Sequence, residues 1–339
     1  MSSSSTIQTD ITDDALLSTN LSINDTSDFP DLSAVGFSYT FQFWYLLICE
    51  IPSLACYLFV FIYILTEKTQ RRALHNHSML VLLVICFPIV LFDYSWTIDS
   101  CRREGGVWFQ GSFLCQVWWL FDYGFYNTSV VILAWSSFQR HILIFHSNLV
   151  STKRKRLFIH YLPLTFILVY LTIFYIYVIF FPPCENQYDF TSAVCGDYPC
   201  YFTVPVLAIW DNIVHGLICT FLIAIFNITL LIRIIWQKRH QRPNWKRYRK
   251  MVVQLLSISA VYLCFNTAPS IIVTVQMAGY PDWGADVYNY FFFFTTSIQF
   301  LVPFICLLHL PNKLRKIRKL ITGNRRRVMP GVIVRPIHH

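Results

Sequence analysis

Seven long apolar stretches alternate with short polar segments along the chain. They run from Phe41 to Leu65, Met79 to Ile98, Leu114 to Ile144, Leu157 to Phe181, Val204 to Trp236, Met251 to Met277 and Val287 to Leu308. A hydrocarbon core about 30 Å thick is crossed by roughly 20 apolar residues in an α-helix, and each stretch reaches that length. The pattern predicts an all-α membrane protein, a seven-transmembrane helix bundle.

The charged residues of the polar segments indicate how such a bundle is oriented. Of the 27 Lys and Arg residues, only Arg102 and Arg103 lie in the segments before the first stretch or after the second, fourth and sixth. Asp residues instead crowd the N-terminal segment, from Asp10 to Asp31. Because basic loops stay on the cytoplasmic side, the N-terminus is expected outside a plasma membrane and the C-terminus inside.

The composition excludes several other classes. With 55% apolar and 13% charged residues, the chain belongs with membrane proteins rather than soluble ones. The net charge of +9 is confined to one side, which favours anionic inner-leaflet lipid as a partner and argues against nucleic acid. Residues 1–36 carry no apolar core of a signal peptide, so no cleaved leader is expected.

The polar ends of the chain have distinct expected roles. Residues 1–36 read as a disordered extracellular segment that is glycosylated at Asn20 and Asn24, each in an Asn-x-Ser/Thr sequon. Residues 37–310 form the membrane domain. Residues 311–322 place apolar side chains on one helical face among cations and predict an amphipathic helix at the membrane surface, followed by a basic tail over 323–339.

Eleven cysteines divide by position. Six lie well inside the apolar stretches, where a thiol usually packs as a small side chain, and Cys115 lies at the outer end of the third. The other five face the expected oxidising side and permit two disulfides with one thiol left over, without fixing the pairing: Cys101, Cys115, Cys184, Cys195 and Cys200.

Two local motifs carry a family resemblance. Trp108-Phe-Gln-Gly111-Ser-Phe-Leu-Cys115 opens the third stretch, and Arg140 follows Cys115 by 25 residues in Ser137-Phe-Gln-Arg140-His141. Both resemble the rhodopsin-like (class A) G-protein-coupled receptors. The resemblance implies that Arg140 faces a heterotrimeric G protein and that Cys115 bridges to the second outer loop. We expect Cys200 as its partner, with Cys184 and Cys195 as the second pair.

The chain departs from that family at several positions. Cys86 stands where the family places a sodium-binding Asp, Gln139 replaces the carboxylate beside the Arg, and Thr267 replaces the usual Trp near Pro269. The chain therefore resembles a divergent, invertebrate neuropeptide-receptor-like type. Without a carboxylate beside Arg140, we expect raised activity in the absence of agonist, insensitive to sodium.

Ionisable residues inside the stretches are the candidate ligand-binding groups. Asp122 lies two helical turns after Cys115, where amine receptors of the resembled family hold a cationic ligand. Asp93, Asp211, His215 and Tyr126 join it as candidates, because a carboxylate at membrane depth needs a partner or a wet cavity. The competing interpretation is internal: Asp211 paired with His215, or carboxylates bonded to neighbouring Tyr and Trp side chains.

The expected function is a receptor for an extracellular cationic ligand, a basic or amidated peptide or else a biogenic amine. The alternative is a membrane transporter or channel, although no internal repeat is evident. A retinal-based sensor needs a Lys within a stretch, and none is present. No nucleophile with its base and no cluster of ligands is evident, so neither an enzyme nor a cofactor is expected.

Overall fold

The computed structural model describes residues 37–67, 74–196, 198–239 and 245–309. The chain divides into two units, Met1–Val35 and Gly36–His339, and only the second contains described residues. The sequons at Asn20 and Asn24, the predicted amphipathic helix 311–322 and the predicted tail 323–339 all lie outside the described residues.

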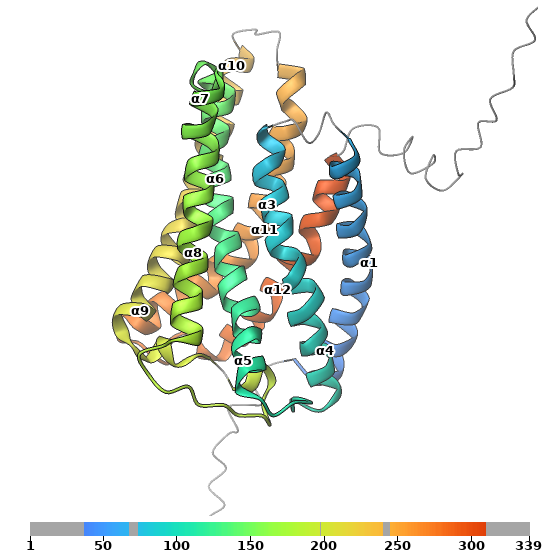
Figure 1. Cartoon of the computed structure of the whole chain (residues 1–339), viewed down its shortest axis with the longest axis vertical. Helices are drawn as coiled ribbons and strands as arrows, with labels where there is room; N and C mark the ends of the chain where they lie inside the picture. The colour runs from blue at the N-terminus through green and yellow to red at the C-terminus, as the bar shows by residue number, and fades with distance from the viewer. Residues whose placement is uncertain (1–36, 68–73, 197, 240–244, 310–339) are drawn as a thin grey trace, which may run out of the picture. The chain divides into compact units, whose positions relative to one another are not determined.

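Seven helical spans make up the described chain, and no strand occurs in it (Figure 1). In chain order the elements are α1 (Tyr39–Thr66); α3 (Leu74–Pro88), η2 (Ile89–Asp93) and α4 (Tyr94–Arg102); α5 (Ser112–Trp119), η3 (Leu120–Phe125) and α6 (Tyr126–Phe145); α7 (Lys153–Arg156), η5 (Leu157–Tyr161) and α8 (Leu162–Phe180); α9 (Pro205–Ile209), η8 (Trp210–Ile218) and α10 (Cys219–Arg239); α11 (Trp245–Met277); and α12 (Ala285–His309).

The predicted fold class is confirmed. All seven helices are long and apolar enough to cross a membrane, and they match the seven predicted stretches within a few residues at each end. The largest differences are at the second span, which runs over Asn76–Arg102 rather than Met79 to Ile98, and at the start of the fourth, Lys153 rather than Leu157. Helix ends extend past the apolar stretch because polar residues also continue a helix once it leaves hydrocarbon.

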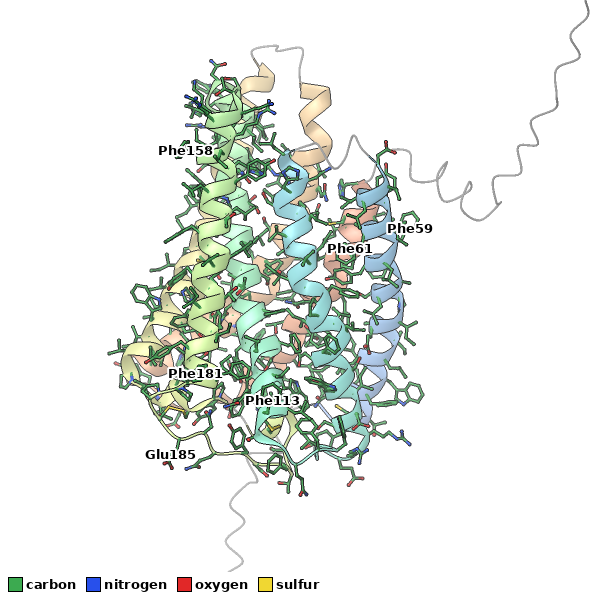
Figure 2. The ribbon with its side chains drawn as sticks, viewed as in Figure 1. Phe59, Phe61, Phe113, Phe158, Phe181 and Glu185 are labelled. Carbon is green, nitrogen blue, oxygen red and sulfur yellow. A yellow bond between two sulfur atoms is a disulfide. The ribbon has the colours of Figure 1, made fainter. Side chains whose placement is uncertain are left out.

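The outer surface of the bundle is apolar, as lipid requires. Large side chains such as Ile48, Phe166 and Trp236 are 65% or more exposed. Phe158 and Phe181, labelled near opposite ends of the fourth span in Figure 2, are similarly exposed. In water such a surface would be an aggregation hazard, whereas in a bilayer it faces acyl chains.

The interior centres on α6, which packs against α3, α8, α10 and α11. Leu82, Leu133, Ile258 and Ile298 are buried together in one hydrophobic cluster to which all seven spans contribute. Helix α12 packs against α1 and α11, which completes the bundle.

The two ends of the bundle differ in chemistry, one carrying the disulfides and the other a cluster of cations. The disulfide end is formed by the end of α4, the start of α5 and the start of α9, beside the segment 181–204, which contributes three of the four disulfide-bonded cysteines (Figure 1). The basic end is formed by α7, with its four cations, and by the end of α6 (Figure 1).

Candidate functional site

Four of the seven spans contain a π-helical segment, and each of these segments carries an ionisable residue. The segments η2, η3, η5 and η8 contain Asp93, Asp122, His160 and the pair Asp211 and His215, respectively. A π turn inserts an extra residue into the i→i+4 ladder, and such turns are rare and frequently lie at functional sites. The coincidence singles out these positions from the rest of the apolar bundle.

Asp93 and Asp122 come together in the half of the bundle nearer the disulfide end. The Trp118 indole N–H donates a hydrogen bond of 2.7 Å to Asp93 Oδ1, and both residues are buried. Asp122 follows Trp118 by four residues on the same face, and Phe121 stacks on Phe92 at 5.3 Å between the same two spans. The Asp122 carboxyl therefore lies within electrostatic range of Asp93.

Asp122 has no internal partner within the part of the chain that the structure describes: neither a hydrogen bond nor an ion pair reaches its carboxylate there. Its electrostatic neighbours are the phenols of Tyr94, Tyr126 and Tyr288, from three further helical elements. Two carboxyl groups this close repel each other when both are ionised. The arrangement suits a cation, which would pair with the carboxylate and lie against aromatic rings.

Tyr126 connects this pair to the neighbouring spans. Its hydroxyl donates to Asn266 Oδ1 on α11 at 2.8 Å, and the Asn266 amide donates to the Thr220 hydroxyl on α10 at 2.9 Å. One turn along α11, Tyr262 donates to the Ser129 hydroxyl on α6 at 2.9 Å. A polar ladder thus joins α11 to α6 immediately beside Asp122.

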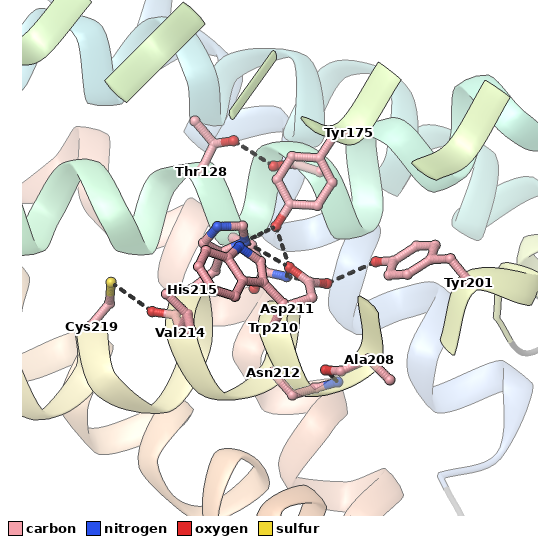
Figure 3. A network of polar contacts seen from close by, with 12 residues as sticks. Thr128, Tyr175, Tyr201, Ala208, Trp210, Asp211, Asn212, Val214, His215 and Cys219 are labelled. Atoms are coloured by element: carbon pink, nitrogen blue, oxygen red, sulfur yellow. Dashed lines mark hydrogen bonds and ion pairs between the residues drawn. The ribbon is translucent and has the colours of Figure 1, made fainter. Parts of the chain in front are cut away.

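Asp211 lies in a different network, shown in Figure 3. The hydroxyl of Tyr175 donates to its Oδ1 at 2.6 Å and that of Tyr201 to its Oδ2 at 2.8 Å. The Asn127 amide reaches both oxygens at 3.4 Å, and His215 Nδ1 lies 3.1 Å from Oδ1. Asp211 is fully buried, and these four side chains supply partners for both oxygens of its carboxylate.

The internal interpretation of Asp211 and His215 is therefore the one that the contacts favour. The outer edge of His215 is also engaged, since Tyr170 lies 2.9 Å from Nε2 and the Trp210 indole donates to Tyr170 at 2.7 Å. Sequence reasoning missed Tyr170, Tyr175 and Tyr201, because tyrosine is common throughout these spans and carries no spacing signal.

The predicted disulfide pairing was wrong. Cys115 is bonded to Cys195 and Cys184 to Cys200, instead of Cys115 to Cys200 and Cys184 to Cys195. The error came from choosing the cysteine nearest the fifth span in sequence. Cys101, which the prediction left outside both disulfides, is a free thiol.

The path of segment 181–204 explains the observed pairing. The Trp119 indole donates to the Val194 carbonyl at 2.8 Å, which holds Cys195 over the start of the third span. Cys200 begins the short helix η7 (Cys200–Thr203), which packs on α9 and places Tyr201 against Asp211. Cys200 is thereby directed away from Cys115.

The same segment contains a tight turn at Asp189. Its carboxylate accepts hydrogen bonds from the Thr191 hydroxyl at 2.6 Å and from the Thr191 backbone N–H at 2.9 Å. These bonds lower the pKa of the Asp189 carboxyl from its ordinary value. Asp189 is exposed and its N–H bonds the Cys195 carbonyl, so it shapes the loop around the disulfide.

Arg140 lies toward the basic end, as expected from its place in the third span, but it is only 2% exposed. Its neighbour Gln139 is also buried and is bonded to Ser78 on α3 and to His160 on η5. Uncharged hydrogen bonds thus hold the position where the resembled family has a carboxylate.

No protein-family model matches the chain, and no curated protein matches it either. The fold and the geometry of these sites must therefore support the function by themselves.

Proposed function

We propose that the chain is a rhodopsin-like receptor whose Asp122 binds a cationic extracellular ligand, a basic or amidated peptide or a biogenic amine, and which activates heterotrimeric G proteins through its basic end. In this proposal the disulfide end and the glycosylated N-terminus face outward from a plasma membrane, and the basic end meets anionic inner-leaflet lipid. The chain acts without enzymatic activity, cofactor or nucleic acid.

The observation that carries the proposal is a carboxylate without an internal cation. An ionised Asp at membrane depth costs about 2.5 to 3.5 kcal/mol on insertion scales, a cost that a partner normally offsets. Asp211 has such partners, whereas Asp122 has neither a hydrogen bond nor an ion pair among the described residues and adds repulsion from Asp93. A cationic ligand supplies what Asp122 lacks.

The polar ladder supports transmission from this site to the basic end. A ligand at Asp122 lies one turn from Tyr126, whose hydroxyl holds Asn266 of α11 at 2.8 Å. Displacing that hydroxyl removes one of the bonds between α11 and α6, close to Pro269, which supplies no backbone N–H to the helix. Ligand binding then shifts a population of α11 positions rather than creating a new one.

The direct test is the Asp122→Asn variant, compared with the parent in a G-protein reporter assay against a panel of basic peptides and amines. Losing one member of a buried charge pair typically costs about 2 to 5 kcal/mol, so the response should weaken by roughly 30-fold or more. Asp99→Asn is the matched control, because Asp99 pairs with Arg103 at the surface of the disulfide end. An unchanged dose response for Asp122→Asn at equal surface expression would refute the ligand assignment.

A transporter or channel is the second candidate, and one observation favours it. The π segments place Asp93, Asp122 and Asp211 at interruptions of regular helix, as the coordinating residues of transporters often are. Ligand-driven ion flux in vesicles that contain the purified chain and no G protein would support this class. A G-protein response without flux would exclude it.

A further inference from the structure

A chain of hydrogen bonds links three spans at the basic end, apart from the candidate ligand site. Ser78 on α3 donates to Gln139 Oε1 on α6 at 2.6 Å, and the Gln139 amide nitrogen contacts His160 Nδ1 on η5. His160 Nε2 lies 3.2 Å from His77 Nδ1, back on α3. The Tyr161 hydroxyl approaches the same His77 nitrogen at 3.3 Å.

With the Gln139 amide oriented so that its Oε1 accepts from Ser78, the donors and acceptors along this chain fit one protonation state. The Gln139 amide donates to His160 Nδ1, so Nδ1 must be bare and Nε2 must carry the hydrogen. That hydrogen is donated to His77 Nδ1, which must also be bare to accept it and the Tyr161 hydroxyl. Both imidazoles are therefore neutral in the intact chain of bonds.

An additional proton has no place in this arrangement. On His160 it would occupy Nδ1 and meet the N–H group of Gln139, two donors face to face. On His77 it would occupy Nδ1 and meet the His160 N–H, again two donors face to face. Either protonation breaks at least one bond that joins α3 or α6 to η5, unless the Gln139 amide rotates.

The charges around His160 do not favour an imidazolium at that position. His160 is fully buried, and within the described residues no carboxylate bonds or pairs with it. On its own span, the side chains of Lys153, Arg154, Lys155 and Arg156 lie one to two turns away. From α6, Arg140 follows Gln139 directly, and from α3 the facing titratable group is His77 itself.

We propose that His77 and His160 form a proton-binding site, and that protonation of this pair uncouples the fourth span from the second and third at the basic end. The signalling consequence rests on the proposed receptor function: acidification on the basic-end side shifts the bundle toward the state that exposes Arg140. Proton binding itself is independent of that function. The site is distinct from Asp122, which lies toward the other end of the same span as Gln139.

The test is thermal unfolding of the purified full chain in detergent between pH 7.5 and 5.5. Because the intact bonds require neutral imidazoles, the folded chain should bind fewer protons than the unfolded one, and stability should fall as pH falls. One such proton corresponds to a drop in apparent Tm of roughly 2 to 4 °C per pH unit. His77→Gln and His160→Gln should each flatten this slope, whereas His146→Gln, at an exposed position beyond α6, should leave it as in the parent.

A second variant keeps the proposal testable if the histidine substitutions fail to fold. Gln139→Glu places a carboxylate against His160 Nδ1, where it stabilises the imidazolium, so the slope should reverse and the variant should gain stability on acidification. Equal slopes in the parent, both histidine variants and Gln139→Glu would overturn the proposal.

The proposed function is tested separately by the agonist response of the parent at neutral pH. A chain that shows the expected slopes but activates no G protein would refute receptor function and leave the proton site standing. A chain that signals normally but shows no histidine-dependent slope would refute the proton site and leave receptor function standing.

Discussion

Asp211 and Asp122 are both carboxylates within membrane spans, and they differ in the hydrogen bonds and ion pairs that reach them. Two tyrosine hydroxyls, an amide and an imidazole reach Asp211, whereas no described hydrogen bond or ion pair reaches Asp122. A saturated carboxylate is held by the fold and stabilises it. An unsaturated one is available to a ligand.

This contrast predicts different phenotypes for the same substitution. Asp211→Asn should lower the stability of the purified chain by about 3 to 5 kcal/mol, because it removes one partner of a buried charged network. Asp99→Asn breaks only the exposed pair with Arg103 and should cost about 1 kcal/mol or less. Thermal unfolding of the two variants beside the parent measures both effects.

The opposite result is equally informative. If Asp211→Asn keeps parental stability and instead weakens a cationic agonist as Asp122→Asn does, then Asp211 belongs to the ligand site and its hydrogen bonds to Tyr175 and Tyr201 give way on binding.

Helix α11 is the element whose movement the proposed mechanism requires, and two hydroxyls restrain it. Tyr126 bonds Asn266, and one turn away Tyr262 bonds Ser129. A variant carrying Tyr126→Phe and Tyr262→Phe loses both bonds and leaves the buried Asn266 Oδ1 without its donor, at about 1 to 3 kcal/mol. Amide hydrogen exchange in α11 should accelerate, and agonist-free signalling should rise.

Thr274→Val provides the control on the same helix, since Thr274 bonds only the Ser270 carbonyl of α11 itself at 2.7 Å. If the double tyrosine variant exchanges no faster than this control, packing rather than the polar ladder restrains α11.

The seven helices were predictable because each depends on a sum over some twenty residues, in which single errors cancel. The π segments were not, since an inserted residue leaves the apolar pattern of the span almost unchanged. Disulfide pairing failed for a related reason. It depends on the course of one loop, where Val194 and Cys195 adopt left-handed backbone conformations (φ 58° and 59°) that no spacing rule indicates.

The residues of the candidate site were likewise predictable only in part. Asp122 was predicted as a candidate from its depth in the third stretch and from the place that the family resemblance gives to a cationic ligand, and helix geometry placed Asp93 in the outer half of the second span. The role of Trp118 was not foreseen, because its indole becomes a hydrogen-bond donor to Asp93 only when two spans pack together. The surroundings of Asp211 depend on Tyr175 of the fourth span and on Tyr201 of η7, whose approach to the carboxylate follows from packing and not from spacing.

For the whole molecule, the distribution of charge predicts which end of the bundle faces outward from the membrane, whereas the packing of the helices does not. Residues 1–36 contain no Lys or Arg, whereas α7 carries four cations. The positive-inside rule then sends the N-terminus into the secretory lumen during synthesis, where the sequons at Asn20 and Asn24 meet the glycosylation machinery.

Expression in animal cells should therefore yield a protein whose electrophoretic mobility increases on enzymatic deglycosylation. The Asn20→Gln, Asn24→Gln double variant should abolish that shift entirely, although two further sequons remain at Asn127 and Asn227. Both of these lie within helices of the bundle, where Asn127 contacts Asp211 and Asn227 bonds Ser137, so neither is accessible to a transferase. A protein that carries no glycan in the parent while an antibody to its N-terminus stains only permeabilised cells would reverse the orientation. The basic end would then face outward, and both the ligand assignment at Asp122 and the G-protein contact at Arg140 would fail together.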